Sequence, residues 1–129
     1  MGKAINLLKK YPKSKRNLKK RALVKSQKIR SVARKFGKEF FDGDRKYGYG
    51  GFNYNPKYWK NVVLDLKKYW KLKPSSSVLD VGCAKGFFLF DLKKKVPNIK
   101  IKGIDISKYA IKNSKKEVSN SLVVGSADK

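Results

Sequence analysis

The alternation of apolar and polar positions predicts a run of strands and helices in the second half of the chain. Three short stretches rich in β-branched residues, 77–81, 99–105 and 122–124, predict strands. Apolar residues at helical spacing predict helices over 87–95 and over 107–118, the second capped by its serine. The order strand, helix, strand, helix, strand is typical of one half of a parallel α/β sheet.

Two helices are predicted in the first half of the chain, a basic amphipathic one and a second that starts at an Asn-Pro pair. From Asn17 to Phe40, apolar residues recur near helical spacing with Lys and Arg between them, which predicts one basic amphipathic helix after a loose tail. Its apolar stripe either packs on the following domain or contacts a membrane surface or RNA. Asn55 and Pro56 then predict a cap and first turn of a second helix, which ends near Lys71.

Between these helices, residues 41–55 form a stretch rich in glycine, aromatic and charged residues. Its glycines predict a loop, and long aromatic loops beside a pocket often act as lids. Arg45, Tyr47 and Tyr49 would then contact a cofactor or an acceptor. The alternative is that the aromatic side chains cover apolar surface while Asp42 or Asp44 pairs with Arg45.

The charge of the chain is strongly positive but carries limited information. The 34 Lys and Arg residues outnumber the 9 Asp and Glu residues, which gives a formal net charge of +25. Residues 1–35 hold 14 of the basic residues and no acidic one, so weak contact with a polyanion through this segment is expected. Only 5 of the 34 are Arg, however, and a general lysine bias would give the same charge.

Cysteine usage and hydropathy indicate the compartment. Cys83 is the only cysteine, which excludes an internal disulfide and is typical of a reducing compartment. No apolar run approaches the ~20 residues of a membrane span, and the amino-terminal residues have no apolar core or cleavage site of a secretory signal. We therefore expect a cytoplasmic protein, and we expect no metal site.

The candidate chemistry lies where the predicted strands end. Residues 82–86 form a glycine turn between the first strand and its helix, and such a turn leaves backbone N–H groups free for a ligand. Asp105 ends the second strand 23 residues after Gly82, a spacing at which a carboxylate meets a ribose above the turn. The turn lacks the spacing of a dinucleotide fingerprint, and Asp80 just before it would repel phosphates but suit an ammonium group. An adenosine-type ligand is therefore predicted.

These residues resemble the class I S-adenosylmethionine-dependent methyltransferases. The first motif of that family has the form [VIL]-L-D-x-G-x-G-x-G, and VLDVGCAKG matches it except that Ala84 replaces the middle glycine. IKGIDIS resembles the second motif and VVGSADK the third. The resemblance covers residues 56–129, and FDGDRKYGYGGF also resembles a segment that precedes the core in some members of the family.

The resemblance implies S-adenosyl-L-methionine as the cofactor. Gly82 and Gly86 would approach its methionine portion, Asp105 would take the ribose hydroxyls, and Ser126 with Ala127 would border the adenine. The full set of residues expected to bind the cofactor is Asp80, Gly82, Cys83, Ala84, Gly86, Asp105, Ile106, Ser126 and Ala127.

Two members of this set have an alternative role. Asp80 would orient the methionine end of the cofactor, or it would brace the turn through hydrogen bonds to backbone N–H groups. Cys83 is expected to be a small turn residue and not a nucleophile, because the chain has no His to activate it.

The sequence therefore predicts three parts: a basic tail and amphipathic helix over 1–40, an aromatic loop over 41–55, and a partial methyltransferase domain over 56–129. The fold class is α/β, a Rossmann-like parallel sheet with flanking helices, and only the first half of the family's seven strands is expected. The function expected is S-adenosylmethionine-dependent methyl transfer by what is interpreted as a fragment. The sequence does not identify the acceptor, for which a small molecule is the expectation. The alternatives are a basic RNA- or membrane-surface-binding module without catalysis, and a nicotinamide-dependent enzyme, which the turn spacing disfavours.

Overall fold

The computed structural model describes residues 2–13, 19–20 and 26–128. In the second half, β1 (Ser77–Val81), β2 (Lys100–Asp105) and β3 (Leu122–Val124) form a parallel sheet in the order β1-β2-β3. Helix α5 (Phe87–Lys95) connects the first two strands, and α6 (Lys108–Lys112) followed by the short 3-10 helix η1 (Lys116–Ser121) connects β2 to β3. The predicted α/β fold class, a partial Rossmann-like sheet with flanking helices, is confirmed.

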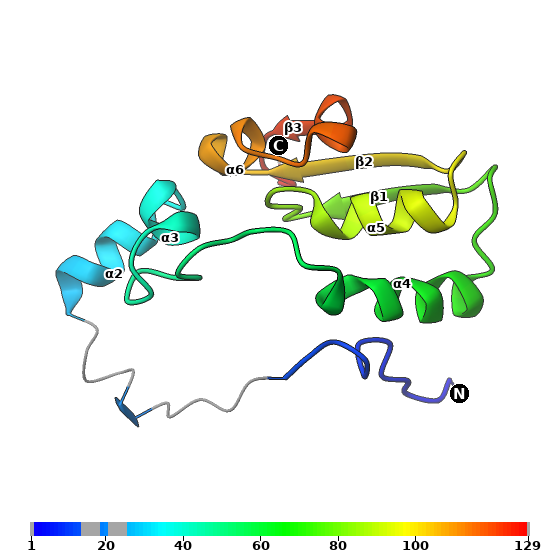
Figure 1. The fold of residues 1–129 in the computed structure, drawn as a ribbon, viewed down its shortest axis with the longest axis horizontal. Coiled ribbons are helices and arrows are strands. Elements are labelled where there is room, and N and C mark those ends of the chain that lie inside the picture. Colours follow the sequence, from blue (N-terminus) through cyan, green and yellow to red (C-terminus); the bar gives the residue numbers. More distant parts are fainter. Residues whose placement is uncertain (1, 14–18, 21–25, 129) are drawn as a thin grey trace.

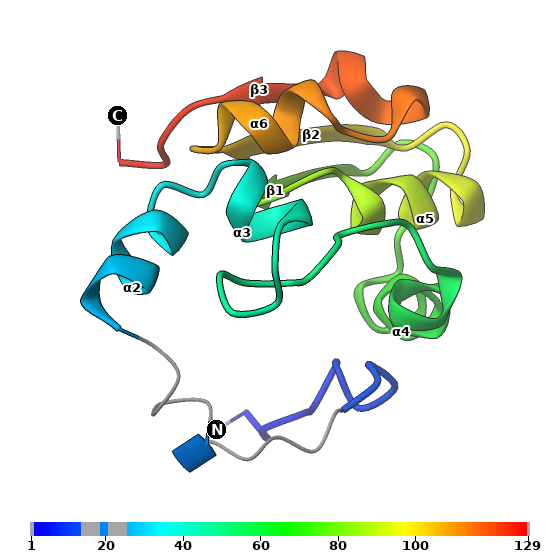
Figure 2. The same cartoon turned by 60° about the vertical axis from the view of Figure 1, so that its left-hand side comes forward.

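The connecting helices lie on one face of the sheet (Figures 1 and 2). Two parallel connections that advance in the same direction place their helices on the same side when both are right-handed. The other face is open, and Leu79 and Val81 of β1 are 59% and 57% exposed there. Successive side chains of a strand point to opposite faces of the sheet, so residues of β1 alternate between the face covered by helices and the open face.

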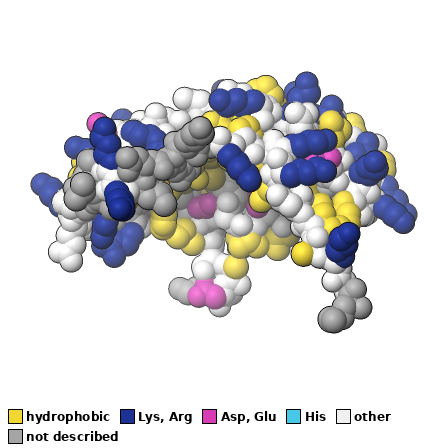
Figure 3. All heavy atoms as spheres, turned by 90° about the horizontal axis from the view of Figure 1, so that it is seen from below, with side chains coloured by type: hydrophobic (Ala, Val, Ile, Leu, Met, Phe, Trp, Pro, Cys, Tyr) yellow, Lys and Arg dark blue, Asp and Glu magenta, His cyan; other side chains and the backbone are white. Residues whose placement is uncertain are grey.

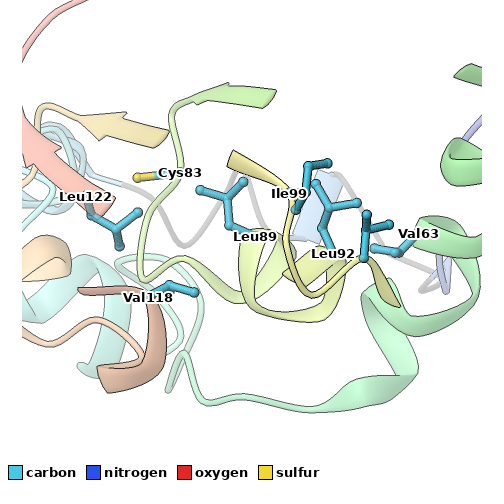
Figure 4. Close-up of a cluster of buried hydrophobic side chains, with 8 residues drawn as sticks. Val63, Cys83, Leu89, Leu92, Ile99, Val118 and Leu122 are labelled. Atoms are coloured by element: carbon cyan, nitrogen blue, oxygen red, sulfur yellow. The ribbon is translucent and has the colours of Figure 1, made fainter. Parts of the chain in front are cut away.

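Helix α4 (Pro56–Trp70) forms a further layer against α5. It begins as predicted, with the Asn55 side chain accepting a hydrogen bond from the backbone N–H of Lys57 (3.0 Å), and it ends at Lys71 in a left-handed conformation. The core lies between α4, α5 and the sheet, where Val63, Leu89, Leu92 and Ile99 are completely buried (Figure 4).

The predicted helix over 17–40 is not continuous. From residue 26 to residue 42 the described chain forms α2 (Gln27–Ala33) and α3 (Lys38–Asp42), and residues 19–20 are also helical. The apolar positions Leu18 and Ala22 of the prediction lie outside the described residues. Helix α2 ends at Ala33, Phe36 then adopts φ +48°, and Gly37 precedes α3. Here tertiary contact overrides helical periodicity, because the Phe36 carbonyl accepts a hydrogen bond from the Ser107 hydroxyl.

Two further boundaries differ from the prediction. The aromatic loop begins at Gly43, because Phe41 and Asp42 belong to α3. The helix predicted over 107–118 ends at Lys112, and the chain is drawn back toward the glycine turn where the N–H of Lys115 bonds the carbonyl of Lys85 (2.9 Å). The Ser107 cap is confirmed, since its hydroxyl accepts from the N–H of Ala110 (3.0 Å).

Candidate functional site

The predicted segments meet at the carboxyl ends of β1 and β2, around Asp105. Its Oδ2 accepts a hydrogen bond from the N–H of Ala84 in the glycine turn, and its Oδ1 accepts from the N–H of Ser107, both at 2.8 Å. Its carbonyl accepts from the N–H of Gly125 (2.9 Å), which brings the third motif alongside. One carboxylate thus joins the turn, the second strand and the start of α6.

The bracing role proposed for Asp80 therefore belongs to Asp105. Each Asp105 oxygen accepts one backbone N–H and retains a lone pair, so the carboxylate can still accept hydroxyl hydrogens. The remaining turn is fixed by the Ile104 carbonyl, which accepts from the N–H groups of Gly82 (2.8 Å) and Cys83 (3.1 Å). Three N–H groups of the turn are thus bonded to the end of β2.

Asp80 differs from Asp105 in having no partner. It is half-buried on β1, and within the described part of the chain no hydrogen bond to its side chain is present. Burial, and then the nearby charge of Asp105, raise the pKa of Asp80 to about 6. A half-buried carboxylate without a donor is suited to a ligand that brings a positive charge or N–H donors.

The two glycines of the turn have different duties. Gly82 and Gly86 both have φ +80°, a backbone conformation that residues with a side chain rarely adopt. A Cβ on Gly82 would meet nothing within 4 Å, so space is open in front of this residue. A Cβ on Gly86 would lie 2.9 Å from the side chains of Val118 and Leu122, so Gly86 serves the packing of the core.

The comparison with protein families agrees with this geometry. Residues 72–124, which include the glycine turn and Asp105, match the family model described as "Methyltransferase domain".

The matched residues, which make up less than half of the chain, are thus similar to a methyltransferase domain.

One solved structure matches part of the chain: a crystal structure of MccD protein, with 26% sequence identity and a TM-score of 0.44. The match covers 58% of this chain and 34% of that one, so the chain spans about a third of the length of MccD protein. The comparison with curated protein sequences gave no match.

Cys83 of the glycine turn is held as an unreactive thiol. It is 6% exposed, and its side chain packs against Gly103 of β2. Burial first, and then the charges of Asp80 and Asp105, raise the pKa of Cys83 to about 12. At neutral pH the thiol is therefore protonated, which agrees with the interpretation of Cys83 as a turn residue.

The other expected cofactor residues lie in the glycine turn or shortly after β2 and β3. Ile106 is 58% exposed just after Asp105. The Ser126 hydroxyl donates to the Asp128 carboxylate, and Ala127 is exposed. Ala84 has φ +51°, so the chain adopts the left-handed turn even though the middle glycine of the motif is absent.

The aromatic loop adjoins the segment that matches the family model, but its three predicted contact residues serve the loop itself. The Arg45 guanidinium donates to the Gly48 carbonyl, and Tyr47 lies under Lys46. Tyr49 is 50% exposed and stacks on Phe52, with ring centroids 4.4 Å apart. None of these contacts reaches the strand ends in the described structure.

The alternative pairing of Asp42 or Asp44 with Arg45 is wrong. Asp44 accepts from the N–H of Lys46 (3.0 Å), and Asp42 pairs with Lys85 (2.8 Å), a residue of the glycine turn that the sequence did not single out. The expected packing role of the loop aromatics is present at its end, where Phe52 and Tyr54 contact the Phe87 ring. A signal for Lys85 did exist, because a Lys inside a tight turn that is otherwise apolar or small needs a partner if it is buried.

Charge and hydropathy complete the picture of the surface. Seen from below, Lys and Arg side chains are spread over the molecule, while some acidic side chains lie in a recess near its middle (Figure 3). No helix among the described residues is both long and apolar enough to cross a membrane.

A cavity of about 410 Å³ between residues 5–9 and α4 lies away from the glycine turn.

Proposed function

We propose that this chain binds S-adenosyl-L-methionine at the carboxyl ends of β1 and β2 and serves methyl transfer. The proposal rests on one observation: two carboxylates lie beside the open glycine turn, and only one of them is hydrogen-bonded to the protein. Asp105 is anchored and keeps lone pairs for a diol, while Asp80 is half-buried without a donor. The match of residues 72–124 to a methyltransferase domain supports the same proposal.

The residues present fit this cofactor at each end. Asp80 would hold the ammonium of the methionine portion, and Asp105 would accept the ribose hydroxyls. Gly82 offers an open approach to the backbone, and residues 125–127 would border the adenine. When bound, the cofactor supplies a methyl group on a sulfonium, which an acceptor displaces in line.

The chain's own contribution is positioning and exclusion of water. The hydrogen bonds from Ala84 and Ser107 to Asp105 fix the ribose acceptor relative to the turn before binding, which reduces the cost of ordering the site. Methyl transfer by displacement needs no protein nucleophile, and the protonated Cys83 thiol agrees with this. The methyl acceptor is not identified. Contact of residues 1–35 with a polyanion stays a prediction, and residues 1, 14–18 and 21–25 of that segment lie outside the described structure.

Calorimetric titration with S-adenosylhomocysteine tests this proposal. We expect the chain to bind it, and Asp80→Asn to weaken binding roughly tenfold or more through loss of a charge-assisted hydrogen bond. Glu117→Gln, an exposed acid on η1, is the matched control and should bind as the parent does. Absence of binding by a folded parent protein, or tight binding of NAD or RNA in its place, would contradict the proposal.

A further inference from the structure

Lys85 occupies an unusual position for a lysine. It lies between Gly82 and Gly86 in the glycine turn, and only 5% of its surface is exposed. Its ammonium nitrogen lies 3.0 and 2.8 Å from the two carboxylate oxygens of Asp42 and 2.8 Å from the carbonyl of Phe52. A lysine ammonium has three donors, so its hydrogen-bonding capacity is matched by residues of a single other segment.

Asp42 is matched just as fully. Besides the Lys85 ammonium, it accepts hydrogen bonds from the N–H of Phe52 (2.9 Å) and from the Tyr109 hydroxyl. Burial alone would raise the pKa of Asp42, but the hydrogen bonds from Lys85, Tyr109 and Phe52 together hold it below the ordinary value. The Asp42 carboxylate is therefore ionised at neutral pH, and the rings of Phe52 and Tyr109 lie within 6 Å of the Lys85 ammonium nitrogen.

These contacts close the aromatic loop onto the turn. Asp42 and Phe52 stand at its two ends, and both bond the same ammonium, so residues 43–51 form a loop whose ends meet at Lys85. Backbone bonds from Tyr49 to Phe40 (2.9 Å) and from Gly51 to Phe41 (3.1 Å) fold the loop back on α3. The loop therefore has a defined position relative to the turn.

The same segment also touches the second connection that leaves the sheet's carboxyl edge. The Phe36 carbonyl accepts from Ser107, whose own N–H bonds Asp105, and Tyr109 of α6 bonds Asp42. Residues 36–52 thus contact both the β1–α5 turn and the start of α6. They border the two groups, Asp105 and the glycine turn, on which the proposed site depends.

We propose that Asp42 and Lys85 are positioning residues that fix the aromatic loop against the glycine turn of the cofactor site. This inference, which we name the Asp42–Lys85 clamp, rests on the proposed function. The clamp makes the position of loop 43–51 and the geometry of the glycine turn interdependent. A ligand that requires the ordered turn then also orders the loop, and loosening the loop lowers the affinity for that ligand.

The experiment combines calorimetry with hydrogen exchange. The parent chain, Asp42→Asn and Lys85→Met are titrated with S-adenosylhomocysteine at a temperature where circular dichroism shows each to be folded. We expect both variants to bind roughly tenfold more weakly than the parent. Asp65→Asn is the matched control, since Asp65 also pairs with a lysine (Lys10, 3.0 Å) but lies on α4 away from the turn, and it should bind as the parent does.

A measurement on the parent alone covers the case in which a variant fails to fold. We expect S-adenosylhomocysteine to slow amide exchange over residues 43–51, although these residues are not expected to touch it. A purely structural ion pair would change stability but would leave this exchange independent of the ligand. The clamp is overturned if the parent binds but loop exchange does not respond, or if folded variants bind as tightly as the parent.

The outcomes separate this inference from the function on which it rests. Absence of binding by the folded parent counts against the cofactor site itself and removes both. Binding by the parent with unchanged affinity in Asp42→Asn and Lys85→Met counts against the clamp alone. Weakened binding in these two variants, together with slower loop exchange on addition of ligand, supports both.

Discussion

Two aspartates beside the same glycine turn have opposite surroundings. Asp42 accepts hydrogen bonds from Lys85, Tyr109 and Phe52, and its pKa is lowered despite burial. Asp80 is half-buried with no donor in the described structure, and its pKa is raised to about 6. The difference distinguishes a carboxylate that stabilises the fold from one that is left for a ligand, since burial of an unmatched charge costs stability that only a function would maintain.

Removal of the Lys85 charge, the partner of Asp42, should have the larger effect on the free energy of unfolding. Lys85→Met leaves the Asp42 carboxylate partly buried without its cation, and breaking a buried pair in this way costs about 3–5 kcal/mol. We expect the free energy of unfolding, measured by urea denaturation, to fall by this amount. A loss below about 1 kcal/mol, the range of an exposed pair, would show that water already screens the clamp.

The double variant Asp42→Asn with Lys85→Met sharpens this prediction. It removes both charges, so it should recover part of the stability lost in Lys85→Met. Recovery identifies the unpaired charge as the cause of the loss. If the two substitutions are instead additive, the loss arises from packing around the lysine stem and not from the ion pair.

Removal of the Asp80 charge should change the free energy of unfolding by less, and in the opposite direction. The pKa of Asp80 is about 6 in the folded chain and about 3.9 in an unfolded chain, so the folded state binds more protons between these values. Stability then falls as pH rises through this window, and the penalty is fully present above about pH 6. Asp80→Asn should therefore stabilise the chain by about 1–2 kcal/mol at pH 7.5, allowing for partial solvent screening.

The pH dependence provides the control for this prediction. At pH 3.5 the Asp80 carboxyl is protonated in the folded chain and largely so in the unfolded one, so the gain from Asp80→Asn should nearly vanish. Urea denaturation of parent and variant across this range measures the difference directly. A gain that is independent of pH would mean that shape and not charge is responsible.

The comparison also shows which features the sequence could predict. Local patterns sufficed for β1, α5, β2 and the Asn55 and Ser107 caps, because side-chain period and capping chemistry act within a few residues. The convergence of three motifs on the strand ends followed from parallel topology. The matching of Lys85 to Asp42 did not follow, because 43 residues separate them and nothing in either neighbourhood encodes the other.

Local reasoning also misassigned features that depend on neighbours in space. Phe36 interrupts a helical pattern because its carbonyl bonds Ser107, 71 residues away. Asp80 and Asp105 are both acids near the turn, and only the structure shows that Asp105 braces the backbone. The binding roles of the cofactor residues stay predictions.

The smallest expected change in the free energy of unfolding is at Ala84, in the glycine turn beside both aspartates. Its φ of +51° costs a non-glycine residue about 1 kcal/mol, although its N–H bonds Asp105 in a geometry that glycine would keep. Ala84→Gly should therefore raise the free energy of unfolding by up to about 1 kcal/mol, seen as a melting temperature a few degrees higher. The control is Ala110→Gly in α6, where the same substitution should lower stability by about 1 kcal/mol or more. If both substitutions destabilise the chain equally, the turn is unstrained, and the absence of the motif's middle glycine has no cost in stability.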